Sequence, residues 1–187
     1  MGRCEIFILS EHTSFMEVDL SRAVRLISPR VTALITTIDK NGKVNAAPYS
    51  WIIPVSFQPP MICLMIGGKH KNTYKNIAET GEFVVNIVSE DFAQEAVDCE
   101  KTHNLESVGL NPIPSKIVKP PRVKQSRAVL ECKLKQFFEP EGSDHIIVVG
   151  EVVAAESVGN LDNIRPLLHD SGEKFRTIGK EVQLKRR

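Results

Sequence analysis

Apolar residues along this chain fall into short runs, most of them rich in β-branched side chains and bounded by Gly, Pro, Asn or Asp. Such runs predict β-strands. One early segment, Asp19 to Ile27, instead repeats apolar residues at helical spacing and predicts a short helix with Leu20, Val24 and Ile27 on one face. The predicted strands are Val31–Ile38, Val44–Val55, Met61–Ile66, Phe83–Val88, Ala128–Phe138 and His145–Glu156.

Turn residues between these runs predict how the strands are connected. Asn41-Gly42 lies between the first two strands and is a strong hairpin signal. Pro48 and Pro54 cannot donate ladder hydrogen bonds, so the second strand is expected to be bent, bulged or at a sheet edge. Two helices are predicted between later strands, Thr73–Glu79 closed by Gly81 and Glu90–Asp98 capped by Ser89.

Hairpin-connected strands with short helices between them predict a mainly β protein built on a closed antiparallel barrel. The regular strand–helix alternation of a doubly wound sheet is missing. Residues 99–118 are weakly patterned and predict a long excursion, and the tail from Asn160 is predicted as loop and short helix. We expect one domain over residues 19–187, preceded by an N-terminal extension of residues 1–18.

Composition narrows the class of protein. The 187 residues have a formal net charge of +1, which argues against a nucleic-acid binder, and no apolar run is long enough to span a membrane. The four cysteines form no CxxC pair, so neither a zinc knuckle nor a thioredoxin-type motif is present. We therefore expect a cytoplasmic protein that binds no metal.

The first candidate segment is Asn45-Ala46-Ala47-Pro48-Tyr49-Ser50-Trp51. Its small side chains would let a flat ligand approach the backbone, and Pro48 leaves neighbouring backbone groups free to bond something else. Asn45 and Ser50 could supply polar contacts to a heteroaromatic ring. The alternative is a bent strand at a barrel corner, where small residues relieve crowding, and the residues alone slightly favour it.

The second candidate segment, Lys69-His70-Lys71-Asn72-Thr73, precedes a predicted helix. A helix N-terminus presents unpaired N–H groups and a positive partial charge, so with two lysines and a Thr hydroxyl it would suit a phosphate. The Walker spacing is absent, which removes the NTPase interpretation. An ordinary helix start with solvated lysines is about equally consistent with the sequence.

Two further segments have polar or charged side chains that could meet a ligand or partner. His145, at the start of a strand, could donate to a ligand or take part in a proton transfer, although a half-exposed polar residue is the commoner case. The basic run from Lys116 to Arg127 could meet a phosphorylated cofactor or an acidic partner, although a solvated loop is commoner. The patterns GxSxG, HExxH and GxGxxG are all absent.

Read in order, the segments resemble the flavin-reductase-like FMN-binding split-barrel family, which includes flavoredoxin-like flavoproteins. The resemblance covers roughly residues 20 to 180 and depends on the shared order of short motifs. These motifs are Ser28-Pro29-Arg30, ALITT, NG, NAAPYSW, Val55-Ser56 followed by Pro59-Pro60, KNTYKNI, TGEFVVNIV, Pro121-Arg122-Val123, LECKL, DHIIVVGEVV and PLLHDSGEKF.

The resemblance implies a six-stranded antiparallel Greek-key split β-barrel, a homodimer, and FMN bound non-covalently near the subunit interface. It implies that the first candidate segment lies along the isoalloxazine ring and that residues 71–76 hold the phosphate. It also implies that His145 lies near the flavin and nicotinamide, and that His169 and Phe175 belong to a loop near the site. The implied cofactor-binding residues are Thr36, Thr37, Asn45, Ala46, Ala47, Pro48, Tyr49, Ser50, Trp51, Lys71, Thr73 and Asn76.

Three functions remain open at this point. The first is an FMN-dependent oxidoreductase that takes a hydride from NADH or NADPH and passes electrons to free flavin or another acceptor. The second is a flavoredoxin-type electron carrier, reduced by an acidic protein that docks on the basic run. The third is a non-catalytic module. The lack of catalytic motifs does not separate them, because hydride transfer to a flavin needs no protein acid, base or nucleophile.

Overall fold

The computed structural model describes residues 15–160 and 163–180, so residues 1–14 of the expected N-terminal extension lie outside the described residues. Its main feature is one seven-stranded sheet in the order β3-β2-β6-β9-β10-β5-β4, with every neighbouring pair antiparallel. The strands are β2 (Ala33–Ile38), β3 (Val44–Tyr49), β4 (Ile52–Phe57), β5 (Pro60–Ile66), β6 (Glu82–Ile87), β9 (Ala128–Phe138) and β10 (Ile146–Ser157).

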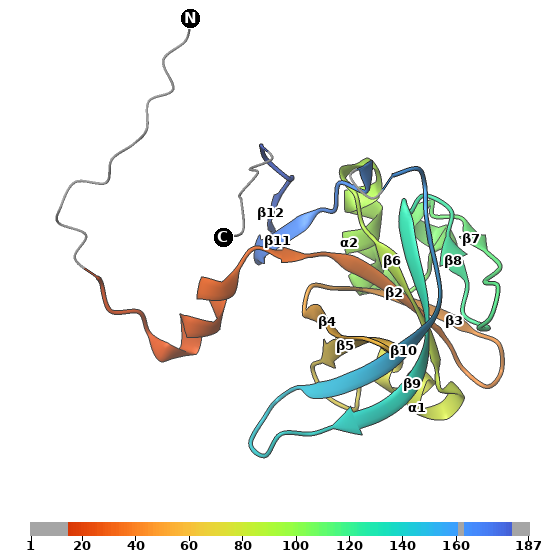
Figure 1. The fold of residues 1–187 in the computed structure, drawn as a ribbon, viewed down its shortest axis with the longest axis horizontal. Helices are drawn as coiled ribbons and strands as arrows, with labels where there is room; N and C mark the ends of the chain where they lie inside the picture. Colours follow the sequence, from red (N-terminus) through yellow and green to blue (C-terminus); the bar gives the residue numbers. More distant parts are fainter. Residues whose placement is uncertain (1–14, 161–162, 181–187) are drawn as a thin grey trace, which may run out of the picture.

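The sheet curls into a barrel (Figure 1), and its two edge strands, β3 and β4, are consecutive in the chain. The predicted strand Val44–Val55 is divided at Ser50 and Trp51, so the sheet has seven strands where six were expected. The prediction that the proline-containing strand lies at an edge is confirmed. The barrel therefore has a seam between β3 and β4 at which the ladder is not continued.

Side chains alternate between two apolar layers, as a pleated sheet requires. Ala33 and Ile35 of β2 face the barrel interior together with Phe83 of β6. Leu34 faces the other way, against Phe92 and the helix that follows it. The same strand thus supplies both cores, and consecutive residues along β2 and β3 reach different parts of the molecule.

Two α-helices pack against the sheet. α1 (Asn72–Thr80) matches the predicted helix and ends, as expected, at Gly81, whose φ of 72° is left-handed. The second predicted helix is displaced, because its first turn is the 3₁₀ segment η2 (Glu90–Phe92) and α2 continues to Thr102 (Ala93–Thr102). α2 packs against β3, while Ile77 of α1 enters the barrel core.

The tail contains a small second sheet that the sequence did not indicate. β11 (Leu168–Ser171) and β12 (Lys174–Arg176) form a hairpin, and β11 also pairs with β1 (Arg30–Val31). The predicted strand Val31–Ile38 is accordingly divided at Thr32, because its start pairs with β11 and its remainder with β6 and β3. The prediction of loop and short helix for this part of the tail is wrong.

The N-terminal helix η1 (Leu20–Ile27) is a 3₁₀ helix that lies apart from the barrel in Figure 1. Its predicted apolar face is present but uncovered, since Leu20 is 87% and Ile27 is 74% exposed. On the barrel itself, Phe57 of β4 is 96% exposed. Exposed apolar side chains on two separate elements suit contact with another surface.

The excursion after α2 is fixed to the barrel by short elements and charges. η3 (Glu106–Val108) is followed by β7 (Pro112–Ile113) and β8 (Arg122–Val123), which pair with each other. The buried Arg122 forms ion pairs with Glu131 and Glu156. Among the described residues no helix combines the length and apolar character needed to cross a membrane.

Candidate functional site

A buried polar cluster lies where α1 begins, at one end of β2 and β3. Asn45 donates through Nδ2 to the hydroxyls of Thr37 (3.3 Å) and Thr73 (3.2 Å), and Asn76 donates to Thr37 (3.0 Å). All four residues are buried. Four candidates chosen from separate parts of the sequence therefore meet in one place.

Tyr49 extends the cluster along β3. Its side chain packs against the barrel core, and burial raises the pKa of its phenol, while a hydrogen bond with the Thr73 side chain partly offsets that rise. Asn45, Ala47 and Tyr49 share one face of the strand because side chains alternate. The cluster is therefore continuous from α1 to the middle of β3.

One atom of the cluster has no partner. The Oδ1 atom of Asn45 is buried and makes no hydrogen bond within the described residues, although the amide nitrogen of the same side chain makes two. A buried polar atom without a partner is costly, on the order of 1–3 kcal/mol. Such an atom is expected where a ligand completes the hydrogen bonding.

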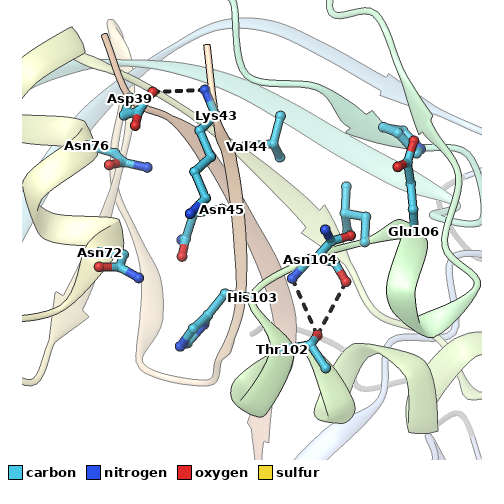
Figure 2. Close-up of a pocket in the computed structure, with 12 residues that line it drawn as sticks. Asp39, Lys43, Val44, Asn45, Asn72, Asn76, Thr102, His103, Asn104 and Glu106 are labelled. Atoms are coloured by element: carbon cyan, nitrogen blue, oxygen red, sulfur yellow. Dashed lines mark hydrogen bonds between the residues drawn. The ribbon is translucent and has the colours of Figure 1, made fainter. Parts of the chain in front are cut away.

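A cavity of about 550 Å³ opens beside Asn45. Figure 2 shows the side chains of Asn45, Asn72 and His103 turned toward one another across it. The main chain of His103 also touches the strand, because its carbonyl accepts from the Ala46 N–H at 3.1 Å. The cavity thus lies between the start of α1, the edge of β3 and the end of α2.

The start of α1 suits an anion. Lys71 is the N-cap residue and is exposed, and no side chain caps the first-turn N–H groups. The first turn contains no acidic residue. Lys69, the other lysine of the candidate segment, is instead paired with Glu139 at 2.8 Å. Of the two lysines predicted to seat a phosphate, only Lys71 is adjacent to the polar cluster.

Two cofactor-binding candidates are turned away from this cluster. Thr36 occupies the opposite face of β2 from Thr37, where its hydroxyl donates to the Pro121 carbonyl at 2.5 Å. The Ala46 side chain is fully buried in the core beneath α2. Only the main chain of Ala46 lies at the strand edge. The side chains of Thr36 and Ala46 therefore do not join the cluster around Asn45.

The other end of the candidate segment lies beside the C-terminal hairpin. The Ser50 hydroxyl is 2.8 Å from Nδ1 of His169, and His169 packs against Phe175 with ring centroids 4.9 Å apart. Pro48 and Ser50 line a second cavity of about 890 Å³, between β3, α2 and this hairpin. The edge of β3 therefore runs from one cavity to the other.

His145 contacts the segment through Trp51. The two rings are stacked with centroids 4.6 Å apart, and the His145 Nδ1 is 2.6 Å from the Asp144 carboxylate. That hydrogen bond lowers the pKa of Asp144 below its ordinary value. Because a carboxylate accepts, Nδ1 carries the hydrogen, which leaves Nε2 of neutral His145 as an acceptor.

Several cations of the basic run from Lys116 to Arg127 form ion pairs with acidic residues of other segments. Lys116 is paired with Glu156, Arg122 with Glu131 and Glu156, and Arg127 with Asp91. Although desolvation acts to raise it, the pKa of Glu131 lies below its ordinary value because three backbone N–H groups and Arg122 stabilise the carboxylate. Three of the five cations thus have acidic partners from other segments, which reduces the positive field of this loop.

The sequence did not indicate that His103 and Asn104 line the first cavity. No local signal marks them, because they are brought to β3 by the position of α2. Among the described residues no group of His, Cys, Asp and Glu side chains is placed to hold a metal ion.

Known proteins share the family and the fold of this chain. Residues 25–179 match the Flavin reductase like domain. A protein of Aquifex aeolicus (strain VF5) is 34% identical over 164 residues, which cover 83% of this chain and 82% of the relative.

Two solved structures have the same fold over most of both chains. The 2-nitrobenzoate 2-nitroreductase NbaA of Pseudomonas fluorescens has a TM-score of 0.80 and 28% identity, covering 94% of this chain and 96% of its own. A proposed flavin reductase with a split barrel domain from Shewanella frigidimarina NCIMB 400 has a TM-score of 0.80 and 21% identity, covering 91% and 94%. The expectation of a mainly β split-barrel fold is confirmed.

The partly buried phenol of Tyr49 gives a direct test of the cluster. The chain has two tyrosines, so a Tyr74→Phe variant isolates Tyr49. We expect the pKa of Tyr49, followed by absorbance at 295 nm, to lie above the ordinary value of about 10, because burial disfavours the phenolate. Thr73→Val in the same background should raise it further, since it removes the offsetting hydrogen bond. A Tyr49 pKa of about 10 in the folded protein, equal to its pKa in urea, would contradict the described burial.

Proposed function

The chain belongs to the flavin reductase like family, and from this premise we propose that it binds FMN non-covalently and takes a hydride from NADH or NADPH. An oxidoreductase is what the family supports directly. The observation that favours flavin binding is the buried cluster of Thr37, Asn45, Thr73 and Asn76 beneath an uncapped helix start.

The residues present fit FMN at both ends of the site. The unpartnered Oδ1 of Asn45 can accept from a hydroxyl of the ligand. The free N–H groups at the start of α1, with Lys71 beside them, can hold one phosphate. One phosphate-binding position of this kind favours FMN, which has a single phosphate, over a dinucleotide flavin.

The edge of β3 provides a surface for the flat ring. From Asn45 to Tyr49 the strand extends about 13 Å, at roughly 3.3 Å per residue. Ala47 is small and only partly buried, and Pro48 and Ser50 line the second cavity. We assign the phosphate to the Asn45 end and the ring to the Ala47–Trp51 end, where backbone groups can set its electrostatics.

Bound FMN would supply the capacity to accept a hydride and to release one or two electrons. The chain's own contribution is binding and orientation. Ser50 offers a hydroxyl, Tyr49 and Trp51 fix the strand by packing, and His145 presents Nε2 beside Trp51. We assign His145 as the catalytic residue that would contact the nicotinamide, because its Nδ1 is fixed by Asp144 and its other nitrogen is free to bond.

The electron acceptor is proposed to be free flavin or another small oxidant. The similar structure from Pseudomonas fluorescens is named a 2-nitroreductase, which suits a small organic acceptor for this chain as well. An electron carrier reduced by an acidic protein is the alternative. The carboxylate partners of Lys116, Arg122 and Arg127 weaken the docking surface on which that alternative depended.

The proposal includes a homodimer in the cytoplasm. Its support is the uncovered apolar face of η1 and the exposed side chains of β4, Ile53, Val55 and Phe57, which a second copy could cover. The free thiols of Cys63, Cys99 and Cys132 suit a reducing compartment.

The nicotinamide step is tested by anaerobic stopped-flow mixing of the flavin-loaded protein with NADH and with NADPH. We expect one of them to bleach the flavin absorbance near 450 nm, and His145→Ala to slow bleaching by about tenfold or more. Lys135→Ala, at an exposed residue of β9, is the control that should keep the rate. Flavin that is bleached by neither nucleotide, but by a reduced electron-transfer protein, would establish the carrier instead.

The dimer is tested by light scattering of the eluting protein. We expect twice the chain mass of 20.9 kDa, and a shift toward the monomer in Ile27→Glu or Phe57→Glu, because each places a charge on an apolar contact surface. Val158→Glu, a similarly exposed site elsewhere, should leave the mass unchanged. A wild-type monomer that still binds FMN would place the whole site in one chain.

A further inference from the structure

The hydrogen bonding of His169 fixes the direction of the Ser50 hydroxyl. His169 lies in β11, with Nδ1 2.8 Å from the Ser50 oxygen and Nε2 3.1 Å from the carbonyl oxygen of Gly172. Both ring nitrogens therefore have a partner. Gly172 lies in the turn of the hairpin and has a left-handed φ of 56°.

The carbonyl of Gly172 determines where the ring hydrogen is. A carbonyl oxygen can only accept, so Nε2 of His169 must carry a hydrogen. In neutral His169 the other nitrogen, Nδ1, is then an acceptor, and the Ser50 hydroxyl donates to it. Ser50 has by then used its only hydrogen, and its oxygen can offer only lone pairs to a ligand.

Protonation of His169 reverses this arrangement. Both ring nitrogens are donors in the imidazolium form, so Nδ1 donates to the Ser50 oxygen. The Ser50 hydrogen is then released and can be donated to a ligand. Ser50 is half-buried and lines the cavity of about 890 Å³ between β3, α2 and the hairpin, so a ligand in that cavity can reach it.

We propose that His169 is a positioning residue whose protonation switches Ser50 between hydrogen-bond acceptor and hydrogen-bond donor toward the bound ligand. The proposal rests on the proposed function, because the ligand it concerns is the flavin ring at the Ser50 end of β3. Two-electron reduction of a flavin converts ring nitrogen N5 from an acceptor into an N–H donor. Neutral His169 therefore favours the reduced form at this contact, and protonated His169 favours the oxidised form.

Several charged and titratable groups lie on the elements around His169. Arg30 of β1 is its register partner, and α2 contributes three charged side chains to the same cavity wall. Asp170 is occupied by Arg176 at 2.9 Å. The titratable and charged groups around His169 are Arg30, Tyr49, Asp98, Glu100, Lys101, Asp170, Glu173, Lys174 and Arg176.

The switch predicts that the relative affinity for oxidised and reduced FMN depends on pH through His169. The measured quantity is the dissociation constant for oxidised FMN divided by that for reduced FMN. Between pH 5.5 and 8.5 we expect this ratio to rise about three- to tenfold more in the wild type than in His169→Asn. In that variant the Asn amide oxygen can take the place of Nδ1 and accept from Ser50 at every pH. The flavin's own ionisation is common to all variants and cancels in the comparison.

Two further variants separate positioning from structure. Ser50→Ala should lose the His169-dependent change, because no hydroxyl is left to be switched. Lys135→Ala, at an exposed residue of β9 outside the hairpin, should keep it. Equal pH dependence in wild type, His169→Asn and Ser50→Ala would overturn the proposal.

A second experiment tests the hydrogen bonding of His169 without bound flavin. Nitrogen NMR of the full chain, with the His169 signal identified by its loss in His169→Asn, should show the Nε2–H tautomer at high pH, and Ser50→Ala should shift the Nδ1 signal. A Nδ1–H tautomer would overturn the switch whatever the ligand is. The expected tautomer together with no FMN binding would instead contradict the proposed function and leave the Ser50–His169 geometry established.

Discussion

The open edge of β3 needs hydrogen-bond partners outside the sheet, and the candidate site is built around that need. β3 pairs only with β2, because the strand order places β3 and β4 at opposite ends of the sheet. At this edge the Ala46 N–H is satisfied by the His103 carbonyl, and Pro48 has no N–H to satisfy. Residues at the two ends of this edge line the two cavities, so the edge is open to a ligand without a competing neighbour strand.

The pleat of the same strand separates the roles of its residues. Asn45, Ala47 and Tyr49 face the barrel end and α1, whereas Ala46, Pro48 and Ser50 face α2 and the C-terminal hairpin. Seven consecutive residues, 45–51, can thus contact a helix start, a hydrogen-bonded cluster and a histidine from the far end of the chain. This arrangement is how the proposed flavin site can be built in a chain without any familiar catalytic motif.

Local features of the site follow from the sequence, and long-range ones do not. The Asn-Gly hairpin, the edge position of the Pro48 strand and the helix ended by Gly81 each depend on residues close in the chain, and each is found as predicted. The division at Thr32, the β11–β12 hairpin and the approach of His103 depend on contacts between distant segments. Apolar spacing also predicted η1 but could not indicate that its apolar face is uncovered.

The central claim is that the edge of β3 and the start of α1 together bind FMN, with the phosphate at α1. The most direct measurement compares dissociation constants for FMN, riboflavin and FAD by fluorescence titration of wild type, Lys71→Ala and Lys75→Ala. Lys75 is an exposed lysine one turn further along the same helix. We predict that Lys71→Ala weakens FMN by about three- to tenfold and leaves riboflavin unchanged, while Lys75→Ala changes neither. Equal losses for FMN and riboflavin, or no flavin binding by the wild type, would contradict the account.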